Sequence, residues 1–151
     1  MTPFPYYPQE TMYTCGAAVM RMALEYCGIV KSEAETMTLL GTNKVKGTKN
    51  KSFSVLAERF QLNHATIRNG TMADLKLYKR KGFVVIIGYL DHVDHIGHYA
   101  VLKKIDATHI YFWDPMFGEN HKYKISRFKK MWKGYHKYDG EDGWFFAVKK
   151  P

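Results

Sequence analysis

The first half of the chain repeats apolar residues with the period of an amphipathic helix. From residue 15 to 26 the apolar positions are Val19, Met22, Ala23 and Tyr26, which have the i, i+3, i+4, i+7 spacing of a half-buried helix. Gly28 is a natural stop for it. Three further stretches predict helices, namely "SEAETMTLLG", "GTKNKSFSVLAERFQL" after its polar start, and "TMADLKLYKRKG". Two of them begin with residues spaced as capping boxes, Ser32 with Glu35 and Thr71 with Asp74.

The second half changes to short apolar and alternating runs that predict β-strands. "FVVIIGYL" (83–90) is rich in β-branched residues, which favours a central strand buried on both faces. The runs at 98–105 and 109–114 predict a hairpin, with further strands at "HKYKI" and "WFFAVKK", a capped helix at "SRFKKMW", and an earlier short strand at "NHATIR". Helices followed by a meander of strands predict an α+β fold. Its N-terminal helices should pack on a C-terminal antiparallel sheet, in one domain spanning 1–151.

Composition excludes some classes and leaves others open. The chain has 151 residues and an apolar fraction of 46%, so it can fill a core. Its net charge of +9 fits an acidic partner, such as nucleic acid, a membrane surface or an acidic peptide, and fits equally a solvated lysine-rich surface. No apolar run approaches the roughly 20 residues that span a bilayer, and no secretory signal is visible, so we expect a cytoplasmic location. Cys15 and Cys27, at the two ends of one helix, would lie about 18 Å apart, too far for a disulfide.

Cys15 stands directly before the first helical run and is followed by Gly-Ala-Ala. The free N–H groups and dipole at a helix N-terminus stabilise negative charge, so this position favours a reactive thiolate. Cys27 sits at the opposite end of the helix, where the dipole disfavours a thiolate, and we interpret it as structural.

A thiolate nucleophile needs a base and a group that orients the base. His98 opens the strand "GHYAVL", and Asp114 ends the next strand, "YFWDPMFG". The start of one hairpin arm and the end of the other lie at the same end of a sheet, so we expect the imidazole and the carboxylate to meet. Gln9, six residues before Cys15, can donate its amide to an oxyanion beside the backbone N–H of Cys15.

The order of "QETMYTCGAA", "GHYAVL" and "WDP" along the chain resembles the C39 family of papain-like cysteine peptidases, best known for domains that cut double-glycine leaders from exported bacterial peptides. The resemblance implies a papain-like peptidase fold over nearly the whole chain. It makes Cys15 the nucleophile, His98 the base, Asp114 its orienting partner and Gln9 the oxyanion donor.

The resemblance also implies a substrate. It would be an extended peptide with small residues, such as Gly-Gly, before the cut, and no cofactor is needed. We expect Gly16, Gly97 and Tyr99, which adjoin the catalytic positions, to contact it. Thr14 stands where many members carry Asp, and the 151 residues contain no transporter, so a leader-peptidase role does not transfer directly.

Three alternatives remain open from the sequence. The fold could serve peptide binding with weak turnover. The segment "DHVDHIGH" concentrates metal-ligand types, although its spacing favours a polar loop, and we expect no metal site there. The segment "HKYKISRFKKMWKGYHKY" mixes basic and aromatic residues as nucleic-acid-binding proteins do, although Phe128, Met131 and Trp132 have the spacing of a packed helix face.

Overall fold

The computed structural model describes residues 3–137 and 140–151. Three helices come first, α1 (Cys15–Tyr26), α2 (Glu33–Leu40) and α3 (Asn50–Arg59). They are followed by β1 (Asn63–Ile67), α4 (Met72–Arg80), β2 (Val84–Leu90), β3 (Gly97–Ile105), β4 (His109–Asp114), β5 (Gly118–Lys124), α5 (Ile125–Met131) and β6 (Phe145–Lys149). The predicted α+β fold class, with helices packed on an antiparallel sheet, is therefore confirmed.

The six strands form one antiparallel sheet in the order β1-β6-β2-β3-β4-β5. The strands β2 to β5 form the predicted meander, and β2 lies inside the sheet with apolar residues on both faces. The last strand, β6, does not extend the meander. It inserts between β1 and β2 and so joins the helical half of the chain to the sheet.

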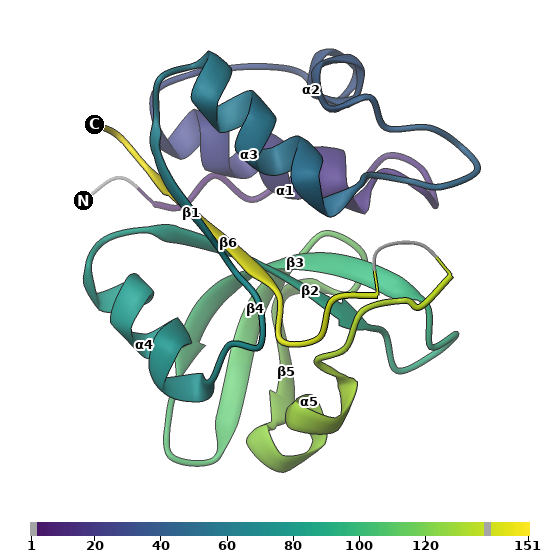
Figure 1. Ribbon diagram of the computed structural model, residues 1–151, viewed down its shortest axis with the longest axis vertical. Helices are drawn as coiled ribbons and strands as arrows, with labels where there is room; N and C mark the ends of the chain where they lie inside the picture. The colour runs from purple at the N-terminus through teal and green to yellow at the C-terminus, as the bar shows by residue number, and fades with distance from the viewer. Residues whose placement is uncertain (1–2, 138–139) are drawn as a thin grey trace.

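Helices cover both faces of the sheet, which gives the molecule two apolar layers. Helices α1 to α3 lie on one side of the sheet and α4 and α5 on the other (Figure 1). The first layer joins α1 and α3 to sheet residues such as Val101 and Phe146, and the second joins Leu75 of α4 and Phe128 of α5 to the opposite face. The sheet is thus buried from both sides, as the near-continuous apolar runs of β2 and β6 require.

Local signals at the helix ends agree with the structure at two helices and fail at a third. Ser32 with Glu35 and Thr71 with Asp74 form complete capping boxes, in which each side chain bonds the other residue's backbone N–H. The predicted cap of the short helix α5 is wrong. That helix begins one residue earlier than expected, and Lys124 at its N-cap makes no side-chain bond to the helix.

Candidate active site

Cys15 is the first residue of α1 and is half-buried, with neither a side-chain cap nor an acidic residue in the first helical turn. Its backbone N–H belongs to the first turn, whose N–H groups have no helical carbonyl to bond. The next residue, Gly16, is fully enclosed: a Cβ there would lie 2.3 Å from Oγ1 of Thr48. Gly16 therefore lets the loop after α2 press against the start of α1, next to the sulfur.

His98 and Asp114 come together at one end of the sheet. Nε2 of His98 lies 2.8 Å from Oδ1 of Asp114, and the two residues are 5% and 0% exposed. The same Oδ1 accepts the backbone N–H groups of Met116 and Phe117 at 2.9 and 3.0 Å. Oδ2 accepts the hydroxyl of Tyr89 at 2.7 Å. The carboxylate is thus fully hydrogen-bonded, as a buried charge requires.

The electrostatics of this pair favour an ion pair at neutral pH. Burial opposes charge on His98, but the hydrogen bond to Asp114 and the interaction with the Cys15 side chain outweigh it and raise the pKa of His98 from 6.5 to about 10. Burial also opposes charge on Asp114, yet the bond and charge of His98, with the donors Tyr89 and Phe117, hold the pKa of Asp114 below its ordinary value. A cationic imidazole therefore stands between the carboxylate and the sulfur.

The N-terminal segment is attached to the strand end that carries Asp114. The hydroxyl of Tyr6 donates to the carbonyl oxygen of Asp114 at 2.7 Å, and the backbone N–H of Gln9 donates to the carbonyl oxygen of Pro115 at 2.9 Å. These bonds fix where the chain enters the turn before Cys15. Within that turn, buried Thr14 accepts the N–H of Thr11 on its hydroxyl at 3.1 Å.

The side chain of Gln9 is bonded within the turn before Cys15. Its Nε2 donates to the carbonyl oxygen of Thr11 at 2.8 Å, and its Oε1 is buried without a hydrogen-bond partner among the described residues. Gln9 is also absent from the described residues that line the cleft. One of its two amide N–H groups is therefore engaged within the turn, and the role of Gln9 as an oxyanion donor stays a prediction.

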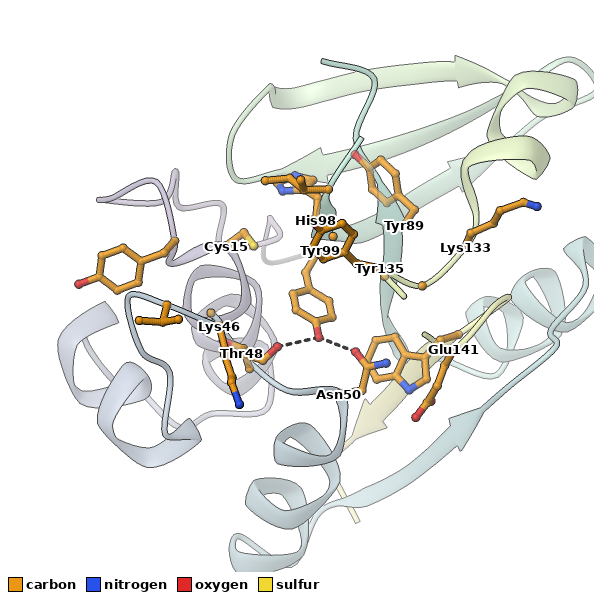
Figure 2. Close-up of a pocket in the computed structure, with 18 of the residues that line it drawn as sticks. Cys15, Lys46, Thr48, Asn50, Tyr89, His98, Tyr99, Lys133, Tyr135 and Glu141 are labelled. Carbon is orange, nitrogen blue, oxygen red and sulfur yellow. Dashed lines mark hydrogen bonds between the residues drawn. The ribbon is translucent and has the colours of Figure 1, made fainter. Parts of the chain in front are cut away.

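A cleft of about 320 Å³ opens beside Cys15 and His98 (Figure 2). Its floor includes Tyr99, whose hydroxyl donates to the carbonyl oxygen of Thr48 and to Oδ1 of Asn50. Of the predicted substrate contacts, Gly97 and Tyr99 line the cleft. Gly16 does not; it is buried against Thr48.

Sequence reasoning missed several residues of this site. The loop from 44 to 48 forms one wall and Trp144 contributes to the floor, but neither carries a local signal because both reach the cleft through tertiary packing. Tyr89 was also missed. It is paired with His98 across β2 and β3, and its ring meets the imidazole edge-on at 5.5 Å.

The two segments considered as alternatives, "DHVDHIGH" and "HKYKISRFKKMWKGYHKY", have several side chains engaged within the protein itself. Nδ1 of His92 lies 2.7 Å from the hydroxyl of Tyr123, while Asp94 and His95 face outward. Across residues 3–137 and 140–151, no group of three or more His, Cys, Asp or Glu side chains is placed to hold a metal ion. In the basic segment, Tyr123, Phe128 and Trp132 are buried in the apolar layer, and its last residue, Tyr138, lies outside the described residues.

No helix in the described part of the chain has the length and apolar character needed to cross a bilayer. Tyr123, Phe128 and Trp132 are held in the core and so are not free to stack on bases, whereas Tyr135 lines the cleft.

Comparison with known proteins shows which folds and which family the chain resembles. No curated protein sequence matches it. Among solved structures, the peptidase domain of Streptococcus ComA, described as a bifunctional ABC transporter involved in quorum sensing, superposes with a TM-score of 0.75 at 18% identity, covering 99% of this chain and all of that one. A putative C39-like peptidase from Bacillus anthracis gives 0.73 at 13% identity, covering 98% and 95%.

A double-glycine-motif protease from an AMS/PCAT transporter, solved in complex with the leader peptide, gives a TM-score of 0.69 at 19% identity, covering 97% of this chain and 91% of that one. At these identities the superpositions establish a shared fold. The model of the peptidase C39 family matches residues 3–136, most of the chain and both halves of the cleft. The chain therefore belongs to the peptidase C39 family.

Proposed function

We propose that this protein is a cysteine peptidase whose nucleophile is Cys15. The observation that carries the proposal is the arrangement of His98, which bonds Asp114 at 2.8 Å, interacts with the Cys15 side chain and lines the same cleft. Nucleophilic catalysis by a thiol needs this order of groups, with a base beside the sulfur and a third group that orients the base.

The reaction follows from the roles of these groups. The Cys15 thiolate attacks the carbonyl carbon of a peptide bond, and the oxygen becomes an oxyanion. In this proposal the backbone N–H of Cys15 and an amide N–H of Gln9 stabilise that charge. His98 gives its proton to the leaving amine, the C–N bond breaks, and the acyl group remains on the sulfur as a thioester. His98 then takes a proton from water, which attacks the thioester and releases the carboxylic acid.

Asp114 keeps the imidazole oriented during both proton transfers. It stays ionised because four hydrogen-bond donors surround its carboxylate, so it stabilises the imidazolium without itself taking the proton.

The substrate we propose is an extended peptide with small residues before the cut, such as Gly-Gly. A double-glycine-motif protease shares this fold and was solved with a leader peptide. Support for this proposal comes from the lining of the cleft, where Tyr99 and Tyr135 lie with His98, because aromatic rings beside the base favour small substrate side chains at that point. A peptide that passes His98 with small residues fits beside these rings.

The test is mass spectrometry of peptide libraries incubated with the wild-type protein and with the Cys15→Ala and Cys27→Ala variants. We expect the same peptides to be cut by the wild type and by Cys27→Ala, because Cys27 is buried away from the cleft, and to remain intact with Cys15→Ala. Equal cleavage by Cys15→Ala would refute the assignment of Cys15 as the nucleophile. Release of peptides without any small residue before the cut would refute the proposed specificity.

A further inference from the structure

The mouth of the cleft exposes apolar side chains that a folded protein ordinarily buries. Met12, Val45 and Ile96 line the cleft and are 76%, 78% and 45% exposed. Isolated exposed apolar residues need no explanation, but a group of them around one opening marks a surface that contacts another molecule.

The loop that carries Val45 is ordered. Oδ1 of Asn43 accepts the backbone N–H groups of Val45 and Lys46 at 3.0 and 2.8 Å. Asn43 and Gly47 exchange backbone hydrogen bonds at 3.1 and 2.8 Å, which closes the turn. Lys44, Val45 and Lys46 are therefore presented together on a fixed turn at the edge of the cleft.

The charged side chains around this opening are unbalanced. Lys44 and Lys46 line one wall and Lys133 lines the other, and Figure 2 shows Lys46 and Lys133 on opposite sides of the cleft. Glu141 is the one acidic residue among the described lining residues, and its carboxylate lies 3.0 Å from Nε of Arg68, which neutralises it. The imidazolium of His98 is balanced by the carboxylate of Asp114, so the three lysines give the mouth of the cleft its net positive field.

We propose that the lysine mouth, defined as Lys44, Lys46 and Lys133, selects peptides with acidic side chains on the residues on either side of the Gly-Gly pair. This inference rests on the proposed peptidase function and names the substrate class for it. In Figure 2 the ammonium groups of Lys46 and Lys133 extend away from the catalytic groups. They therefore meet substrate residues outside the catalytic centre, while Met12, Val45 and Ile96 offer apolar contacts at the mouth of the cleft.

The effect of each lysine should be modest because exposed ion pairs are screened by water. A single exposed pair changes an equilibrium about two- to fivefold, so three lysines together predict a preference of about ten- to a hundredfold. Since the lysines are solvent-exposed, the preference should shrink as ionic strength rises and the Debye length falls to about 3 Å near 1 M salt.

The experiment uses three peptide pools that differ only in carrying Glu, Gln or Lys at fixed positions on both sides of a Gly-Gly pair. We expect kcat/KM for the wild-type protein to fall in the order Glu, Gln, Lys at low salt and to converge at high salt. The triple variant Lys44→Gln, Lys46→Gln, Lys133→Gln should cut the Glu and Gln pools at equal rates.

A matched control removes three lysines elsewhere. Lys76→Gln, Lys124→Gln, Lys130→Gln loses the same charge from exposed positions outside the cleft lining and should keep the preference for Glu. Equal rates for the Glu and Gln pools with the wild type, or loss of the preference in the control triple, would overturn the proposal and leave the peptidase function standing.

A binding measurement separates the two hypotheses if no pool is cut. Fluorescence anisotropy with the Cys15→Ala variant reports the affinity for labelled pools without turnover. Tighter binding of the Glu pool that disappears in the lysine-mouth variant supports acidic recognition even when proteolysis fails. Equal binding of the Glu and Lys pools refutes it.

Discussion

Replacing Tyr89 by Phe removes one hydroxyl from behind the catalytic pair. That hydroxyl donates to Oδ2 of Asp114 at 2.7 Å, and Tyr89 is 1% exposed. The ring itself remains, including its edge-on contact with His98. The change therefore removes the hydrogen bond to Asp114, together with the interaction of the same hydroxyl with Tyr123, and leaves the ring packing in place.

The structure sets the size of the effect. A hydrogen bond to a charged group contributes about 1.5–3 kcal/mol, and its loss leaves Oδ2 buried without its donor. We expect the free energy of unfolding to fall by about that amount. Oδ1 keeps its three donors, so Asp114 stays ionised but turns more freely, and His98 with it. If about 1.4 kcal/mol of the loss appears in the transition state, kcat falls about tenfold.

The assay is steady-state kinetics and urea denaturation on the same preparations, with Tyr111→Phe as the matched control. The hydroxyl of Tyr111 also donates to a carboxylate at 2.7 Å, but its partner is Asp106, at the far turn of the hairpin. We expect Tyr111→Phe to leave kcat unchanged. If Tyr89→Phe loses stability while its kcat equals that of the wild type, the Tyr89–Asp114 bond is structural and the positioning argument is wrong.

Four further outcomes follow from the same geometry. Cys15→Ala removes the side-chain interaction that helps raise the pKa of His98, so this pKa should fall from about 10. NMR titration of the imidazole protons measures it, and an unchanged pKa would show that the sulfur does not interact with the ring. Because the folded-state pKa of His98 lies above 6.5, the stability it contributes is complete below about pH 6.5 and is lost as pH rises towards 10, which urea denaturation across this range should show. Gly16→Ala should cost about 1–3 kcal/mol in urea denaturation because the new Cβ meets Thr48, and full stability would contradict the close approach. Iodoacetamide should modify Cys15 well before Cys27, whose thiol is 5% exposed and whose pKa is raised by burial, and mass mapping that finds equal labelling would argue against a reactive Cys15.

The features that the sequence predicts best are those decided within a few residues. The capping boxes at Ser32 and Thr71 need only a side chain and the N–H three residues on, and both form. The cap expected at the start of the last helix does not form. Ser126 lies inside α5, and the helix begins after Lys124 without a capping side chain. Packing of Phe128 against the sheet holds that helix in place of a cap.

Strand order was beyond local reasoning. The apolar run of β6 indicates a strand buried on both faces, but not which strands lie beside it, and β6 separates β1 from β2. The meeting of His98 with Asp114 could be anticipated because consecutive antiparallel strands form a hairpin. Tyr89 and Thr48 could not, since one reaches Asp114 across a second strand and the other arrives on a loop folded over α1.

The layered architecture has a consequence for how the molecule should lose activity. The sulfur is carried by a helix on one side of an apolar seam, and the imidazole and carboxylate are carried by the sheet on the other side. A displacement of about 1 Å between reacting groups can slow a reaction about a hundredfold. Sliding of α1 along β3 would therefore abolish activity while every helix and strand stays intact. The reaction rate is thus a more sensitive measure of how the two layers are aligned than any spectrum of secondary structure.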